Sequence, residues 1–458
     1  MFRPVELPLW LLLLILLFAA VTFATHFINP TVRWFFRGRM ERAVARLNQR
    51  LQVPIQPFKL ARRHDTILRL SYDPEVTQAV ADHARETGLR EDAAFALAQK
   101  YAREIVPSFS ASAYFGFAIR AARWLSTSLF RVQVQAERED LLRGIDPDST
   151  IVFVMNHRSN MDYVLVTWLA GNRSALSYAV GEWARVWPLS ALIRAMGAFF
   201  IRRRSRNALY RRVLARYVQM ATAAGVTQAM FPEGRLSLTG AVGTARMGLL
   251  SYIVEGQNTG RDVVFVPVAL NYDQVLEDRI LVRAASQKAS ERRFRGSIVS
   301  NAVFVLQWTL RRITGKARRF GVAAVAFGAP LALSSVPMGP GRIETVAGTL
   351  MDRLRGAVPV PPVPLYCLAL VQADGPLGEA ELVARVADLR ARMAASGVMC
   401  PQEQGTAPLT LLRLREMITE GPEGISIRPD HAELVAFYAN SIAHHLADDP
   451  ITARDAAT

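Results

Sequence analysis

One histidine and one aspartate, five residues apart, are the side chains of this sequence best suited to acid–base chemistry. His157 and Asp162 lie in the run NHRSNMDY, which follows the apolar run IVFVM. Chemistry in α/β folds lies just beyond the carboxyl ends of buried strands. If Asp162 accepts a hydrogen bond from one ring nitrogen of His157, the other nitrogen can take a proton from an alcohol. No G-x-S-x-G elbow is present, so we expect that alcohol to belong to the substrate.

The spacing of the pair restricts its geometry. Five residues of one regular helix turn through about 500°, so the two side chains meet only if His157 lies in a turn and Asp162 in the first helical turn. Ser159 and Asp162 match the S-x-x-D capping pattern, which predicts Ser159 at the N-cap. A purely structural interpretation stays open, in which Asp162 caps the helix and His157 is a polar loop residue.

Three further segments could contribute to a binding site. In GAFFIRRR, Arg202 and Arg203 end an apolar run and could bind a phosphate, or form a solvated basic end. In FPEGRLSLTG, Glu233 and Gly234 mark a tight turn, where backbone N–H groups could hold an oxyanion; an ordinary turn is the alternative. In VVFVPVALNYD, Pro267 predicts an edge strand or a bulge.

Metal and cofactor chemistry have little support in the sequence. Of the seven histidines, His157 is the one inside the α/β region, which argues against a multi-histidine metal site there. Walker A and dinucleotide-binding glycine patterns are missing. The two cysteines, Cys367 and Cys400, form no C-x-x-C pair. We therefore expect neither a metal nor a resident cofactor.

Alternating strand-like and helical runs predict an α/β domain with a buried sheet. Helical spacing dominates before it, in DPEVTQAVADHARETGL with its Asp73–Pro74 start signal and in AAFALAQKYAREIV. FGFAIRAARWLSTSLFRV is either a core helix or one that lies on a membrane surface. The predicted strands are 151–155, 198–201, 227–231, 263–270 and 323–327, and a helix is predicted over 209–224.

Four regions follow from this pattern. VPVPPVPLYC, near Pro361, is interpreted as a linker, followed by a small helical region. The predicted regions are a membrane anchor (1–30), a helical N-terminal region (31–149), the α/β domain (150–345) and a helical C-terminal region (346–458).

The N-terminus and the overall charge indicate a membrane location. Residues 7–24 are uncharged and apolar, about the length of a membrane-spanning helix. Arginines follow this run, and basic flanks tend to stay cytoplasmic, so we expect a single uncleaved anchor with the catalytic domain on the cytoplasmic side; a cleaved signal peptide is the alternative. The net charge of +16 favours anionic partners such as membrane phospholipids.

The order and spacing of these motifs resemble the four-block signature of the glycerolipid acyltransferases. H-x-x-x-x-D, GAFFIRR, F-P-E-G and V-P-V follow one another in that order. Within the superfamily, the chain is most similar to the bacterial membrane and mitochondrial glycerol-3-phosphate acyltransferases. FYANSIAHHL, from Phe437 onward, is similar to a C-terminal stretch of that branch.

The resemblance implies transfer of an acyl group from acyl-CoA or acyl carrier protein to glycerol 3-phosphate, on a mixed-sheet α/β fold, with no metal, no cofactor and no nucleic acid. It implies that His157 deprotonates the acceptor hydroxyl and that Asp162 orients His157. The residues expected at the substrate are Arg158, Arg202, Arg203, Glu233, Gly234, Arg235, Ser237 and Pro267.

The third block departs from the branch pattern. Where that branch has E-G-G-R-S-R-[ST]-G, this sequence has E-G-R-L-S-L-T-G, so Leu236 and Leu238 replace arginines. Arg235, Arg204 or Arg246 could substitute. A lysophosphatidate or other lysophospholipid acceptor is the first alternative. The second is an inactive, membrane-tethered protein that binds lipid or nucleic acid, against which the intact His157–Asp162 pair argues.

Overall fold

The computed structural model divides the chain into two compact units. Residues 1–54 with 172–174 form one unit, and residues 55–171 with 175–458 form the other. The structure describes residues 42, 44–135, 143–171, 174–181, 189–202, 207–257, 260–286, 319–401 and 407–446. The predicted anchor, 7–24, lies outside these residues. Within them, no single helix is long and apolar enough to cross a membrane. Taken together, α15 (Arg342–Ala357) and α16 (Pro362–Val371) have the length and composition of a membrane span, but their axes are bent by 93° relative to each other.

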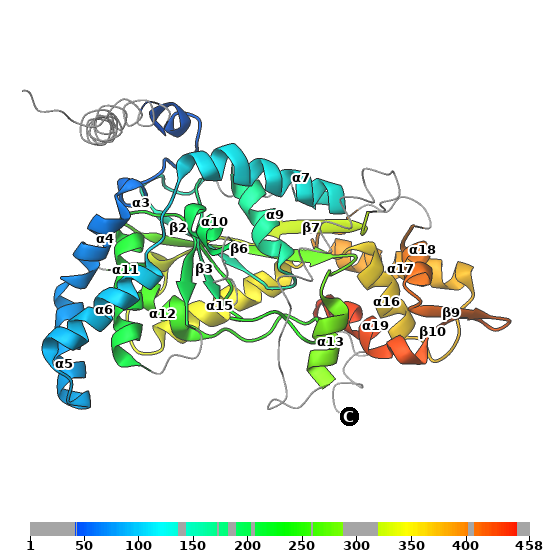
Figure 1. Cartoon of the computed structure of the whole chain (residues 1–458). Helices are drawn as coiled ribbons and strands as arrows, with labels where there is room; N and C mark the ends of the chain where they lie inside the picture. Colours follow the sequence, from blue (N-terminus) through cyan, green and yellow to red (C-terminus); the bar gives the residue numbers. More distant parts are fainter. Residues whose placement is uncertain are drawn as a thin grey trace, which may run out of the picture. The chain divides into compact units, whose positions relative to one another are not determined.

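A mixed sheet forms the centre of the larger unit, which confirms the predicted fold class (Figure 1). Its order is β1-β7-β6-β2-β5-β3-β4, with β8 added beside β6. β7 and β8 run antiparallel to β6, and β1 runs parallel to β7; the strands from β6 to β4 run parallel to one another. The strands are β1 (Arg131–Val134), β2 (Thr150–Met155), β3 (Ser177–Gly181), β4 (Phe199–Ile201), β5 (Gln228–Met230), β6 (Val263–Tyr272), β7 (Val322–Phe327) and β8 (Leu331–Ala332).

Helices cover both faces of this sheet. In β2, Val152 and Val154 belong to one hydrophobic cluster, whereas Phe153 and Met155 belong to another, as the alternation of a strand requires. The first cluster includes residues of α4 (Arg63–Ser71), α5 (Pro74–Thr87), α6 (Glu91–Ile105), α11 (Ala208–Ala223), α12 (Met247–Glu255) and α15. The second includes residues of α9 (Met161–Ala170), α10 (Leu189–Ala195), α13 (Asp278–Ser286), α16, α17 (Glu379–Ala395), α18 (Ala407–Leu414) and α19 (Ala432–Ala439).

Both helical regions therefore share their cores with the sheet. β1 already belongs to the sheet, so the sheet begins before residue 150, where the sequence predicted its start. The C-terminal region also contains a hairpin of β9 (Ile418–Gly421) and β10 (Gly424–Ile427), which the sequence did not predict. The remaining short elements are α3 (Pro57–Leu60), the π-helix η2 (Ser112–Ala118), α7 (Ile119–Leu129) and the 3-10 turns η5 (Leu333–Ser335), η6 (Pro429–His431) and η7 (Ala443–Leu446).

Pro267 lies in an interior strand, so the predicted edge position is wrong. β6 pairs with β2 along one side, and on the other side it pairs with β7 from Val268 onward and with β8 at Val264 and Phe265. Pro267 sits where that second partner changes, and its carbonyl accepts a hydrogen bond of 2.9 Å from Gly328 N. The missing proline N–H therefore coincides with a break in the ladder, the situation that permits proline inside a sheet.

The segment interpreted as a linker is a buried helix. α16 starts at Pro362, and its residues from Pro362 to Leu370 are all buried. Prolines are tolerated in the first turn of a helix, whose N–H groups have no partner within the helix. Proline content therefore misled the interpretation, and the apolar residues that follow it decided the structure.

Candidate active site

Asp162 is fully buried, and its carboxylate accepts hydrogen bonds from four donors. His157 Nδ1 lies 3.0 Å from Oδ2, which also accepts from the backbone N–H groups of Arg158 (2.7 Å) and Ser159 (3.0 Å). The Tyr272 hydroxyl donates to Oδ1 over 2.7 Å. These four donors fix the position of the Asp162 carboxylate beside the imidazole.

The first turn of α9 places Asp162 where the spacing required. His157 lies in the turn between β2 and α9, and Asp162 is the second residue of the helix. Asp162 reaches back to the N–H of Ser159, and Ser159 Oγ accepts from Met161 N over 3.1 Å. Ser159 therefore caps the helix in function, although the regular N-cap position falls on Asn160, one residue later.

Glu277 fixes this turn from outside. Its carboxylate accepts hydrogen bonds from Ser159 Oγ (2.7 Å) and from Asn160 Nδ2 (3.0 Å). Glu277 is itself buried, and that burial raises the pKa of its carboxyl group, while the bonds from Ser159 and Asn160 lower it. Burial of an acid has an energetic cost, and the contacts of Glu277 to the turn that contains His157 and Asp162 (referred to as the catalytic turn, after its predicted role) offset part of it.

The ring and backbone of His157 are held on several sides. Phe231 stacks on the imidazole with ring centroids 4.1 Å apart, and Tyr163 meets it edge-on at 5.4 Å. The N–H of His157 donates to Glu233 Oε1 (3.0 Å), and its carbonyl accepts from Ser237 N (2.9 Å). The ring has therefore little freedom to turn, and with Nδ1 committed to Asp162, Nε2 is the nitrogen that can accept a substrate proton.

The third block braces His157 through its own backbone and side chains. Glu233 also accepts from Gly243 N over 2.9 Å, and burial raises the pKa of its carboxyl group. Gly234 has a positive φ of 66°, and its N–H donates to Phe231 O. Ser237 Oγ donates to Ala241 O over 2.7 Å. The Glu233 carboxylate, the Gly234 N–H and the Ser237 hydroxyl are therefore all hydrogen-bonded within the protein. In this structure they stabilise the loop that contacts His157.

Arg158 is buried and contacts other parts of the protein, whereas the sequence predicted that it would contact the substrate. Its side chain is 2% exposed, and its guanidinium lies 4.8 Å from the Phe437 ring centre and donates from Nη1 to Gly240 O. Burial lowers the pKa of Arg158. Among the described residues, Nε and Nη2 find no hydrogen-bond partner. Arg158 therefore joins the catalytic turn to the third block and to α19.

The expected phosphate ligand Arg202 lies away from the catalytic turn. It follows β4, the outermost strand, and two strands separate β4 from β2. Its Nε and Nη2 bind both carboxylate oxygens of Glu104 (2.8 and 2.6 Å), which raises the pKa of Arg202. Arg203 lies outside the described residues. Pro267 is buried within β6, where it supports the sheet.

Two exposed arginines lie beside the third-block turn. Arg235 directly follows Gly234, and its side chain is exposed. Arg246 is also exposed, and its N–H donates to Pro232 O over 2.8 Å. The side chain of Arg246 passes so close to Gly234 that a β-carbon there would lie 2.9 Å from Cδ. Both cations are therefore available at the surface near Glu233, whose carboxylate holds His157.

The sequence did not predict that Tyr272 and Glu277 contact the catalytic turn. Tyr272 is the last residue of β6, so the rule that chemistry follows strand ends could have identified it. Glu277 stands in a loop with no local pattern. The partners of both residues lie more than a hundred positions earlier in the chain, which one sequence alone does not show.

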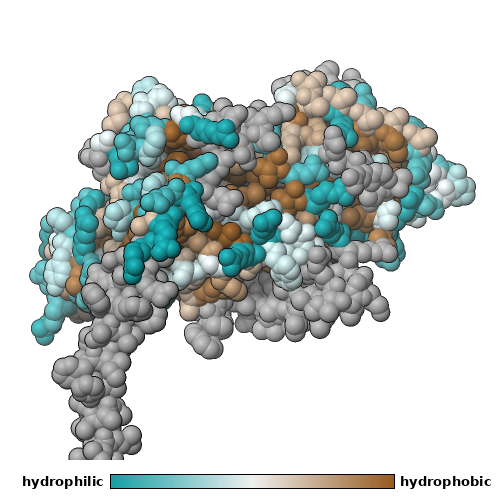
Figure 2. Space-filling model, turned by 90° about the horizontal axis from the view of Figure 1, so that it is seen from above, coloured by the Kyte–Doolittle hydropathy of each residue, from teal (hydrophilic) through white to brown (hydrophobic). Residues whose placement is uncertain are grey.

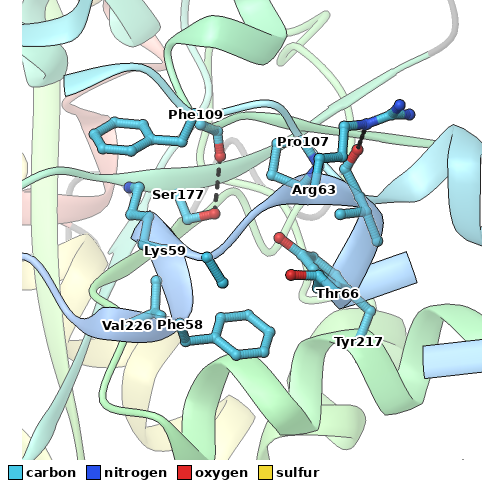
Figure 3. Close-up of a pocket in the computed structure, with 12 residues that line it drawn as sticks. Phe58, Lys59, Arg63, Thr66, Pro107, Phe109, Ser177, Tyr217 and Val226 are labelled. Carbon is cyan, nitrogen blue, oxygen red and sulfur yellow. Dashed lines mark hydrogen bonds between the residues drawn. The ribbon is translucent and has the colours of Figure 1, made fainter. Parts of the chain in front are cut away.

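A small cavity elsewhere in this unit is unrelated to the catalytic turn. It has a volume of about 30 Å³ and lies beside Lys59, Arg63, Ser177 and Tyr217 (Figure 3). Lys59 Nζ donates to the carbonyls of Ala175 and Leu176, each over 2.6 Å, and burial lowers its pKa. A cavity of this size has room for water but not for a phosphorylated substrate.

Two family models match separate parts of this chain. The acyltransferase family model matches residues 133–271, and the model of the glycerol-3-phosphate acyltransferase C-terminal region matches residues 306–454. The chain is therefore similar to the glycerol-3-phosphate acyltransferases in two separate regions. The first model contains both the His157 turn and the third block, and the second contains α19, which packs against them.

Relatives named glycerol-3-phosphate acyltransferase match most of this chain. The protein from Xanthomonas campestris pathovar campestris is 26% identical over 406 residues, 81% of this chain and 44% of its own length. The protein from Pseudomonas putida is 26% identical over 447 residues, 89% of this chain and 52% of its own. The chain thus spans about half the length of the curated relatives it matches. The solved structure of a 1-acyl-sn-glycerophosphate acyltransferase from Thermotoga maritima is 18% identical to this chain. The match covers 64% of this chain and 98% of the Thermotoga chain, and its TM-score of 0.32 is too low to support an argument about the fold.

Proposed function

We propose that this protein transfers a fatty acyl group from an acyl thioester to a hydroxyl of glycerol 3-phosphate, forming lysophosphatidate. The observation that carries the proposal is the buried His157–Asp162 pair, with Nδ1 held by the carboxylate at 3.0 Å. Among the described residues, no serine or cysteine side chain hydrogen-bonds to the His157 ring, which supports direct attack by the substrate alcohol. The similarity to proteins named glycerol-3-phosphate acyltransferase supports the class of alcohol. The donor is acyl-CoA or acyl carrier protein.

The proton moves in two steps. As the substrate oxygen attacks the thioester carbonyl carbon, Nε2 of His157 takes the hydroxyl proton, and Asp162 stabilises the imidazolium that forms. When the tetrahedral intermediate collapses, the carbon–sulfur bond breaks, and the imidazolium returns the proton to the leaving thiolate. The products are an ester and a free thiol, and no acyl-enzyme forms.

The acceptor phosphate is expected at Arg235 and Arg246. Both are exposed beside the turn that holds His157, whereas Arg202 is committed to Glu104. The guanidinium group suits bidentate phosphate binding.

We also propose that the apolar run at 7–24 anchors the chain to the cytoplasmic membrane, with the catalytic domain on the cytoplasmic side.

The leucines of the third block do not favour a lysophospholipid acceptor. Leu236 is buried and belongs to the hydrophobic cluster that also contains Phe437, and Leu238 packs against the same cluster. Side chains that fill the core do not select an apolar substrate. Acylation of lysophosphatidate is the competing outcome in a test of acceptor choice.

The test offers glycerol 3-phosphate and lysophosphatidate in parallel to membranes that contain the protein. We expect a product from glycerol 3-phosphate with either acyl-CoA or acyl carrier protein as donor. A product from lysophosphatidate alone would overturn the proposed acceptor.

A second measurement tests the base. His157→Ala should lower turnover by about two to four orders of magnitude, while the exposed His64 provides a matched control, His64→Ala, that should keep wild-type turnover. A His157→Ala protein that is folded and retains most of its activity would show that His157 is not the base.

A further inference from the structure

One helical surface of the larger unit is both apolar and basic. η2 and α7 form a continuous helical segment from Ser112 to Leu129. Its outward side carries Phe117, 60% exposed, and Trp124, 48% exposed. Arg120 and Arg123 are exposed beside them. We refer to these four residues as the α7 face.

The opposite side of the same segment is buried at intervals of four residues. Tyr114, Ala118, Ala122 and Ser126 are all buried, as the period of a helix requires for one inward side. The sequence left open whether this segment is a core helix or one that lies on a surface. The structure shows one side in the core and an aromatic, arginine-bearing side in solvent.

The charged side chains of this helical segment are all of one sign. Residues 107–134 contain no aspartate or glutamate, so Arg120 and Arg123 have no carboxylate near them within that segment. Large exposed aromatic side chains together with arginines are typical of helices that lie in the interface of an anionic bilayer. Arginine can extend its guanidinium to the headgroups while its alkyl chain stays in apolar surroundings.

The position of α7 in the molecule suits such a contact. α7 runs along one side of the larger unit (Figure 1), and Figure 2, which views that side, shows apolar groups exposed among polar ones. Two arginines within one turn of Trp124 make the segment unsuited to cross the bilayer, where a buried charge is costly. An orientation parallel to the membrane surface satisfies both kinds of side chain.

We propose that the α7 face docks on an anionic lipid surface, with Phe117 and Trp124 inserted at the headgroup level and Arg120 and Arg123 at lipid phosphates. This goes beyond the proposed reaction and does not depend on it, because lipid contact is measured without turnover. It is also distinct from the expected N-terminal anchor, which tethers the chain without setting its orientation.

Docking through this face would fix the height of the catalytic helix above the lipid. α7 packs against α9, which carries Asp162. The contact is close: a β-carbon on Gly171, at the end of α9, would lie 2.5 Å from Cδ1 of Ile119 at the start of α7. α9 therefore has to follow the orientation of α7.

The experiment places an environment-sensitive fluorophore on single cysteines of the full chain in phosphatidylglycerol-containing vesicles. The test positions are Phe117→Cys and Trp124→Cys, and the control is Met338→Cys, which replaces a residue that is 79% exposed in a different part of the unit. A Cys400→Ser background avoids labelling of that partly accessible thiol, whereas Cys367 is buried. We expect blue-shifted emission and quenching by brominated lipids at 117 and 124, and neither at 338.

Two results would overturn the proposal. Emission at 117 and 124 as water-like as at 338 would show that the α7 face does not touch lipid. Blue-shifted emission at both positions in detergent-free buffer without vesicles would show that protein covers the face. Reversal of charge in the Arg120→Glu, Arg123→Glu variant should abolish most quenching at 117 while the thermal unfolding temperature stays unchanged; unchanged quenching would refute the role of the arginines.

Discussion

At the residue scale, the important property of Asp162 is the number of donors that hold it. Three donors fix Oδ2 and one fixes Oδ1, so the carboxylate cannot rotate away from the imidazole without breaking several bonds. His157 is fixed in turn by Phe231 and by Glu233. A base that is already oriented loses no further entropy when the substrate binds, and such positioning is a large part of catalysis.

Tyr272→Phe tests this orientation with the loss of one oxygen atom. Removal of the hydroxyl that donates to Asp162 Oδ1 should lower kcat about tenfold, with KM for glycerol 3-phosphate nearly unchanged, because a hydrogen bond to a charged group contributes roughly 1.5–3 kcal/mol. Tyr114→Phe is the control, since its hydroxyl accepts from Leu176 N far from the catalytic turn. Wild-type kcat in Tyr272→Phe would mean that Oδ1 needs no donor.

Glu277→Gln distinguishes an effect on the position of the catalytic turn from an effect on the stability of the protein. The amide keeps one acceptor oxygen where the carboxylate offers two to Ser159 and Asn160, so we expect kcat to fall about tenfold, on the scale of one hydrogen bond to a charged group. Burial raises the pKa of Glu277 in the folded state. The folded state therefore favours the protonated form of Glu277. The contribution of this group to the free energy of unfolding is complete below the ordinary pKa of glutamate, and it is lost as the pH rises through the raised pKa.

The measurement is the free energy of unfolding of both proteins across that pH range. The glutamine variant should match the wild-type protein in acid and become the more stable of the two as the pH rises. A variant that is both slower and less stable at neutral pH would show that Glu277 is mainly structural.

Sequence alone identified His157 and Asp162 because their partnership is local. The capping pattern and the strand-end rule both act within a few residues. Tyr272, Glu277 and the contact of Arg158 with Phe437 depend on chain segments that meet only in the fold. For Arg202, an arginine after a strand has the same local pattern whether it meets a phosphate or an acidic side chain, so the sequence did not predict the pairing with Glu104.

At the scale of elements, the third block and α19 pack backbone against backbone. Gly240 has a positive φ of 91°, and a β-carbon there would lie 1.8 Å from the carbonyl oxygen of Phe437. Asn440 Nδ2 donates to Thr239 O over 3.1 Å. Since Ser237 in the same loop donates to His157 O, α19 supports the catalytic turn through one intermediate loop.

Gly240→Ala should therefore separate the loop from α19. We expect a loss of more than about 2 kcal/mol of stability, because both the backbone angle and the contact reject a side chain, and a fall in kcat at temperatures where the protein stays folded. Gly348→Ala is the matched control: it lies in α15 with nothing within 4 Å of the added carbon, and should gain about 0.5–1 kcal/mol. Chemical denaturation of both variants is the measurement, and equal stability would contradict the packing.

Elements with a strong apolar run were predictable, and those stabilised by their neighbours were not. The apolar run at 151–155 became β2, and the predicted strand at 263–270 became β6. β1 was missed because its sequence, RVQV, is short and partly exposed, and β3 because a five-residue strand ending in glycine has little signal of its own. Both depend on pairing with β7 and β5 respectively.

At the scale of the whole molecule, the C-terminal region and the sheet are joined by a buried ion pair as well as by a shared core. Arg415 Nη2 and the Tyr438 hydroxyl both donate to Asp278 Oδ2, at the start of α13. The Tyr438 hydroxyl also accepts from Val275 N over 2.9 Å. The segment after β6 thus holds the catalytic turn through Glu277 and the C-terminal region through Asp278.

Arg415→Met should leave the charge of Asp278 buried without its cation. We expect a loss of about 3–5 kcal/mol and a lower melting temperature for the whole 55–446 region, seen alike by far-ultraviolet circular dichroism and by loss of activity. Arg428→Met, which removes an exposed pair with Glu416, is the control and should change stability by less than about 1 kcal/mol. Loss of activity well below the main transition would show that the C-terminal region unfolds separately.

The contact between Gly240 and Phe437 has a consequence for synthesis on the ribosome. A nascent chain that has emerged as far as β7 already contains His157, Asp162 and every strand partner of β2. The loop that contacts His157 nevertheless lacks its contact with α19 until Phe437 has been translated. Premature termination before that residue would thus release a sheet whose base lacks one of its supports, and we expect fragments left by stalled translation to acylate substrates more slowly than the full chain.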